Sequence, residues 1–125
     1  MKALVVVAHG SRRAASNTEV GELACRLAGL VHTDYPLVSA GFLELAEPSI
    51  PQALENVIAQ GATEVKIFPY FLSAGRHVVT DVPEEVQKVQ SKHPQIAFHI
   101  LPHLGDLPDL TTLIADALLS CSPEH

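Results

Sequence analysis

The chain has 125 residues, of which 47% are hydrophobic and 18% charged, and its formal net charge is −6 at pH 7. This acidic balance argues against nucleic acid as a partner, because phosphate backbones are bound by basic surfaces. No apolar run approaches the ~20 residues of a membrane span, the apolar N-terminal run is too short for a signal peptide, and two cysteines make no disulfide framework. We therefore expect one domain over residues 1–125, in the cytoplasm, with no membrane partner.

Four apolar runs, each followed by a segment of helical spacing, indicate an α/β fold. The expected strands are residues 3–8, 37–43, 64–71 and 96–101. The expected helices begin near residues 16, 49, 81 and 106. Strands that alternate with helices are typical of a parallel sheet that carries helices on both faces and is joined by right-handed crossovers. We predict a four-stranded sheet in the spatial order 2-1-3-4, with helices on both faces.

Local signals predict how the helices begin and which side chains they bury. A serine or aspartate followed three residues later by Glu or Gln is typical of a helix N-terminus. The pairs are Ser16 with Glu19, Ser49 with Gln52, and Asp81 with Glu84. Cys25 falls on the apolar face of the first helix, so we expect it in the core. The last helix should bury Leu110, Leu113, Ile114, Ala117 and Leu118.

An ionisable residue follows every predicted strand. These residues are His9 after the first strand, Glu44 and Glu47 after the second, Arg76 and His77 after the third, and His103 after the fourth. Each has an ordinary structural explanation when taken alone: a turn, a helix cap, a solvated loop charge or, for His103, a tight turn. Ligands of open parallel sheets bind outside the carboxyl ends of the strands, and all four exits share that edge. The joint pattern predicts a functional site there.

Arg12, Arg13 and Arg76 lie beside the two histidine loops. They either serve solubility or form a local cationic rim for an anionic substrate on an otherwise acidic protein. Several other chemistries are disfavoured. Histidine phosphatases place Arg before His-Gly, where this chain has Ala8. Glycine-rich dinucleotide and triphosphate motifs are absent from the sequence, and a zinc hydrolase would need a third ligand with fixed spacing.

Three segments resemble the small sirohydrochlorin cobaltochelatases, class II chelatases of the cobalamin and sirohaem pathways. They are residues 6–12 (VVAHGSR), 42–51 (FLELAEPSIP) and 68–83 (FPYFLSAGRHVVTDVP). In that family, histidines matching His9 and His77 hold the incoming metal, and the one matching His9 accepts a proton. The resemblance assigns substrate contacts to Glu47 and to the loop Leu72, Ser73, Ala74, Gly75 and Arg76. Glu44 and His103 are further candidates.

The resemblance implies a lyase that inserts a divalent metal, foremost Co²⁺, into sirohydrochlorin for cobalamin (vitamin B12) biosynthesis. It also implies a chelatase-like three-layer α/β fold and a homodimer, with Co²⁺, Ni²⁺ or Fe²⁺ as substrate and no tightly bound cofactor. A neutral imidazole can ligate such a metal and accept a pyrrole proton, and two imidazoles would release the ion more readily than a closed four-ligand site. Two alternatives remain: a sirohydrochlorin ferrochelatase of sirohaem synthesis, and a non-catalytic carrier of metal or tetrapyrrole.

Overall fold

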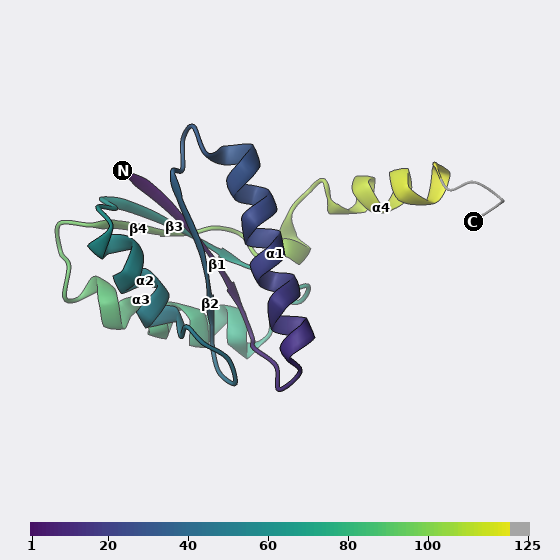
Figure 1. Ribbon diagram of the computed structural model, residues 1–125. Coiled ribbons are helices and arrows are strands. Elements are labelled where there is room, and N and C mark those ends of the chain that lie inside the picture. Colours follow the sequence, from purple (N-terminus) through teal and green to yellow (C-terminus); the bar gives the residue numbers. More distant parts are fainter. Residues whose placement is uncertain (121–125) are drawn as a thin grey trace.

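A computed structural model describes residues 1–120 and contains one parallel four-stranded sheet. Its strands are β1 (Lys2–Ala8), β2 (Leu37–Phe42), β3 (Glu64–Pro69) and β4 (Ala97–Ile100). Their spatial order is β2-β1-β3-β4, and every neighbouring pair is parallel (Figure 1). The predicted order is confirmed. β1 is an inner strand, with β2 on one side and β3 on the other. Its continuously apolar sequence fits this position, because such a strand is buried on both faces of the sheet.

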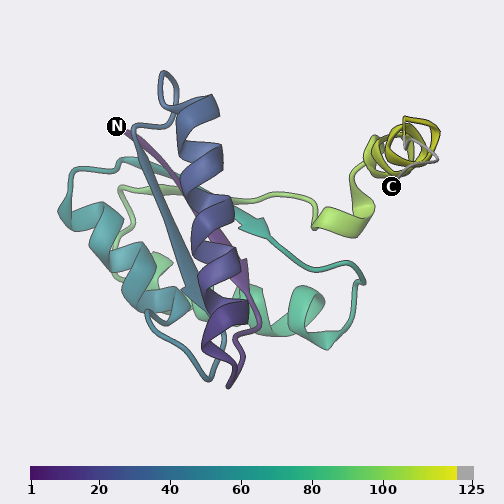
Figure 2. The same ribbon diagram turned by 45° about the vertical axis from the view of Figure 1, so that its right-hand side comes forward.

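Helices cover both faces of this sheet (Figures 1 and 2). α1 (Ala14–Val31) covers one face, and α2 (Ile50–Ala59) and α3 (Val82–Gln90) cover the other. The chain also forms a π-helix at His77–Asp81, a 3₁₀ helix at Leu104–Asp106 and a last helix, α4 (Leu110–Leu119). Alternate residues of β1 serve different layers, since side chains of a strand alternate between faces. Val5 and Val7 pack with α2 and α3, whereas Leu4 and Val6 pack with α1.

The fourth helix departs from the expected arrangement. We predicted that α4 would bury an apolar face, yet none of its residues is buried within the described part of the chain. It projects away from the sheet in both views (Figures 1 and 2). The apolar periodicity identified the helix correctly but not its packing partner.

Two of the three predicted helix caps are wrong. Ser49 does cap α2, because its hydroxyl accepts a hydrogen bond from the Gln52 amide at 3.2 Å. Helix α1 instead starts at Ala14, ahead of the expected Ser16. Asp81 has helical backbone angles and makes no cap hydrogen bond, because the π-helix has already begun at His77.

Cys25 is exposed on the outer surface of α1, so its predicted place in the core is also wrong. The apolar stripe of that helix is narrower than its sequence suggests, with Val20 and Ala24 as its buried residues.

No helix within residues 1–120 has both the length and the apolar character needed to cross a membrane.

Candidate metal and substrate site

The parallel pairing of β1 and β3 brings the two histidine loops together. Val7 is in register with Pro69, and the Tyr70 amide donates to the Val7 carbonyl at 2.8 Å. Both strands therefore leave the sheet side by side. The His9 and His77 rings lie with their centroids 4.4 Å apart and their planes inclined by 53°. The adjacency expected from the predicted strand order is confirmed.

Gly10 shapes the turn that presents His9. Its φ of +96° lies in the left-handed region that favours glycine, and a Cβ at this position would lie 1.7 Å from the Glu44 carbonyl oxygen. The exit of β2 can thus approach closely, and the Glu44 amide donates to the His9 carbonyl at 3.0 Å. The same approach places Glu44 Oε1 2.7 Å from His9 Nε2.

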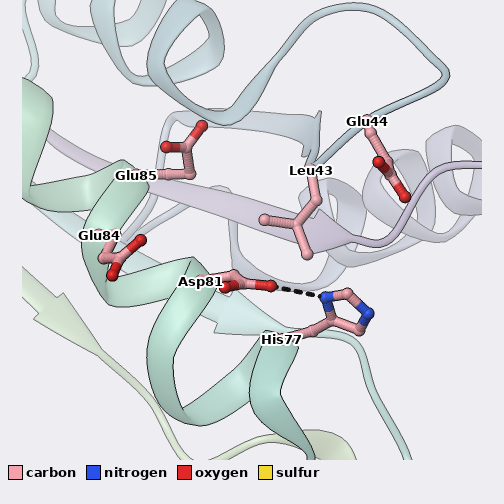
Figure 3. A pocket seen from close by; sticks show the side chains of 6 residues that line it. All are labelled: Leu43, Glu44, His77, Asp81, Glu84 and Glu85. Carbon is pink, nitrogen blue, oxygen red and sulfur yellow. Dashed lines mark hydrogen bonds and ion pairs between the residues drawn. The ribbon is translucent and has the colours of Figure 1, made fainter.

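A π-helix presents His77. Asp81 lies one turn further on, and its Oδ2 is 2.8 Å from His77 Nδ1 (Figure 3). An ionised carboxylate only accepts hydrogen bonds, so Nδ1 donates and the Nε2 of a neutral ring keeps its lone pair. A carboxylate that fixes a histidine tautomer in this way is the usual support of a metal-binding imidazole.

Acidic side chains surround this pair of imidazoles. A hollow of about 190 Å³ is lined by Leu43, Glu44, His77, Asp81, Glu84 and Glu85 (Figure 3). The His9 and His77 side chains are 43% and 45% exposed, so a ligand can reach both from solvent. Among residues 1–120, no group of three or more His, Cys, Asp or Glu side chains is arranged to hold a metal. The arrangement offers two accessible imidazoles rather than a closed cage.

The other predicted site residues lie in several separate places around the His9–His77 pair. Glu44 joins it directly, whereas Glu47 lines a separate hollow with Ser49 and Gln52. The side chains of Arg12, Arg13 and the segment from Leu72 to Arg76 are exposed. His103 is half-buried just before the 3₁₀ helix.

Sequence reasoning missed the support that Asp81 gives to His77. It assigned Asp81 to a helix cap and did not consider that a histidine and an aspartate four residues apart meet on one side of a helical turn. That spacing was the available signal. Glu84 and Glu85 were also missed as lining residues. Glu84 was assigned to the predicted cap, and no pattern in the sequence set Glu85 apart.

Solved structures of similar fold cover almost the whole chain. A putative cobalamin biosynthesis CbiX protein from Marinobacter aquaeolei superposes with a TM-score of 0.75 at 27% identity, covering 95% of each chain. SirB from Bacillus subtilis, solved with Fe³⁺, gives a TM-score of 0.78 at 26% identity, covering 97% of this chain and 48% of SirB.

Relatives of higher sequence identity are named as chelatases of iron or as chelatases of cobalt. The chloroplastic sirohydrochlorin ferrochelatase of Arabidopsis thaliana is 35% identical over 118 residues, covering 94% of this chain and 52% of that protein. The sirohydrochlorin cobaltochelatase of Methanocaldococcus jannaschii is 39% identical over 95 residues, covering 74% of this chain and 64% of that protein. The chain thus spans between half and two thirds of the length of these two relatives.

A family model described as CbiX matches residues 3–121, which include both histidine loops and all four strands. The parallel sheet, the adjacent His9 and His77, and the similarity to solved CbiX and SirB structures agree with that match. The chain belongs to the CbiX family.

Proposed function

We propose that this chain is a sirohydrochlorin chelatase that inserts a divalent metal, foremost Co²⁺, into the macrocycle during cobalamin biosynthesis. The observation that carries the proposal is the contact between two half-exposed imidazoles at the carboxyl edge of a parallel sheet. Membership of the CbiX family and the names of the relatives support it. Within this proposal, residues 1–125 act as one chelatase-like domain.

Each residue of the site has a chemical task in this proposal. His9 and His77 hold the metal between them, with His77 using the Nε2 lone pair that its hydrogen bond to Asp81 leaves free. Once the metal has passed to the pyrrole nitrogens, the lone pair of His9 is free and accepts one of the two pyrrole protons, since a neutral imidazole is a base near pH 7, and the second proton leaves to solvent. Glu47 and the exposed loop before His77 contact the macrocycle.

The remaining parts of the proposal concern partners and surroundings. We place the protein in the cytoplasm, with a tetrapyrrole substrate and neither nucleic acid nor membrane as partner. The proposed assembly is a homodimer, because one chain of this size exposes its site on an open rim and a second copy would help to enclose a large macrocycle. The metal is a substrate, with no tightly bound cofactor.

A sirohydrochlorin ferrochelatase is the second candidate, because relatives of similar identity carry either metal name. The deciding experiment is anaerobic incubation of the protein with sirohydrochlorin and Co²⁺, Ni²⁺ or Fe²⁺, followed by absorbance. We expect catalytic turnover with at least one metal and the highest kcat/KM with Co²⁺. A spectral change that stops after one molecule of sirohydrochlorin per protein chain would indicate a carrier instead.

Asp81→Ala should weaken Co²⁺ binding by about 10–100-fold, because the His77 ring loses the acceptor that fixes its tautomer and orientation. Asp81→Asn should retain much of the affinity, since its amide oxygen can still accept from Nδ1. Titration calorimetry with Co²⁺ measures both variants. Equal affinity in Asp81→Ala and wild type would remove Asp81 from the support of the metal.

Arg76→Ala and the double variant Arg12→Ala/Arg13→Ala should raise KM more than they lower kcat, because exposed cations attract a polycarboxylate before it reaches the histidines. The wild-type KM should also rise with salt. The control is Lys92→Ala, which removes an exposed positive charge beyond the end of α3. If KM stays constant in the arginine variants, these residues do not steer the substrate.

A further inference from the structure

The side chain of Asn17 fastens the loop that carries His9. Its Oδ1 accepts a hydrogen bond from the Ser11 amide at 2.9 Å, and its Nδ2 donates to the Ser11 carbonyl at 2.8 Å. One side-chain amide thus satisfies the backbone donor and the backbone acceptor of a residue six positions earlier. Both hydrogen bonds are partly buried, which strengthens them relative to fully exposed ones. These two hydrogen bonds are called the Asn17 clamp here.

The position of Asn17 in α1 explains why its side chain reaches this loop. The helix begins at Ala14, so Asn17 lies in its first turn. The Cα–Cβ bonds of a helix tilt toward its N-terminus, and a side chain in the first turn therefore points back over the segment that enters the helix. Asparagine is also a weaker helix former than alanine. Its side chain serves the preceding loop rather than the helix itself.

Gly10 makes such a fastening necessary for His9. Glycine has the greatest conformational freedom of all residues, and Gly10 adopts a φ of +96°. On one side of Gly10, the Glu44 amide donates to the His9 carbonyl at 3.0 Å. On the other side, the Asn17 clamp holds Ser11. Gly10 alone separates these two fixed points, so the clamp limits the conformations of the turn and hence the directions in which the His9 ring can point.

We propose that Asn17 is the positioning residue of His9, whose clamp holds the His9 ring beside the His77 ring. The centroids of the two rings are 4.4 Å apart, which requires both loops to be fixed. Ligands held in place by the fold bind more tightly than mobile ones, because binding then orders fewer groups. This inference rests on the proposed function, since it takes His9 as a metal ligand. Asn17 itself contacts neither metal nor macrocycle in it.

The residues between the clamp and the helix have hydrogen bonds of their own. The Arg13 amide donates to Ser11 Oγ at 3.0 Å, and the Ser16 amide donates to the Arg13 carbonyl at 3.1 Å. Loss of the clamp should therefore disturb His9, across the flexible Gly10, more than Arg13. Asn17→Ala should accordingly raise the Kd for Co²⁺ more than it raises the KM for sirohydrochlorin.

The test is a double-mutant cycle read by Co²⁺ titration, in which paramagnetic shifts of histidine ring signals report weak as well as tight binding. Asn17→Ala should weaken Co²⁺ binding by about 10-fold, as expected of a residue that orients a ligand. In the His9→Ala background the same change should alter Kd by less than about twofold, because the ligand on which the clamp acts is gone. In the Asp81→Ala background it should again cost about 10-fold, because Asp81 contacts His77 instead.

Thr18→Ala is the matched control. The Thr18 hydroxyl donates to the Ala14 carbonyl at 3.0 Å, so this change also removes a side-chain hydrogen bond in the first turns of α1. It should leave the Co²⁺ affinity within about twofold of wild type. Thermal unfolding checks that Asn17→Ala stays folded, as the higher helix propensity of alanine favours. An equal loss with and without His9, or no loss in folded Asn17→Ala, would overturn the proposal.

Nuclear magnetic resonance without metal separates this inference from the proposed function. Asn17→Ala should shift or broaden the ring signals of His9 more than those of His93, whose Nε2 lies 2.7 Å from Glu55 Oε1 on a different part of the chain. Unchanged His9 signals would overturn the clamp, whatever the protein does with cobalt. If the His9 signals change while His9→Ala leaves Co²⁺ affinity at the wild-type value, the clamp stands and the metal-binding role proposed for His9 fails.

Discussion

Replacing either His9 or His77 by alanine should lower the chelation rate by at least about 100-fold, the usual contribution of a positioned acid–base group. Each variant loses one of two metal ligands, and the ring that remains has no adjacent imidazole. The double variant should be little worse than either single one, because residues that act as a unit show non-additive losses. Both side chains are nearly half exposed, so their removal should cost little stability.

The measurement is the initial rate of metal insertion in each variant at saturating sirohydrochlorin, with thermal unfolding as the folding control. His32→Ala is the matched control, because His32 is exposed just beyond the end of α1, and it should retain the wild-type rate. His103→Ala should cause a smaller loss than either of the paired histidines. Near-wild-type rates in His9→Ala or His77→Ala would refute the proposed mechanism and leave the fold and the family unaffected.

Gly10→Ala should lower both the stability of the protein and its activity. The new methyl group would meet the Glu44 carbonyl oxygen at 1.7 Å, and the backbone φ of +96° is strained for alanine. Backbone strain and steric overlap each cost about 1–3 kcal/mol, so we expect the free energy of unfolding to fall by about 3 kcal/mol. Relaxation of the turn should also move His9 away from His77 and lower the chelation rate in the fraction that remains folded.

Urea unfolding of Gly10→Ala and of a matched control measures this effect. The control is Gly21→Ala, which makes the same change within α1, where a Cβ would meet no atom within 4 Å. Gly21→Ala should raise the free energy of unfolding by about 0.5–1 kcal/mol, because alanine is a better helix former than glycine. If the two variants unfold at the same urea concentration, the close approach at Gly10 does not contribute to stability.

The sequence by itself determined the elements and their order in the sheet. The continuously apolar β1 could be satisfied only between two covered faces, and strands alternating with helices required parallel pairing with right-handed crossovers. Once β1 and β3 were neighbours, the two loops that carry His9 and His77 had to leave the sheet at the same edge. Local chemistry was also sufficient for Ser49, whose cap depends only on residues within one helical turn.

Only the tertiary structure decided where contacts between distant segments would override local preference. Asp81 was a credible N-cap by sequence, but the helix starts earlier, and its carboxylate instead lies beside the His77 ring. Glu44 meets His9 because Gly10 lets the β2 exit approach, a contact across 35 positions that no periodicity encodes. The apolar spacing of α4 predicted a buried face without naming its partner. Hydrophobic burial is non-directional, so the apolar pattern could not specify which surface the helix contacts.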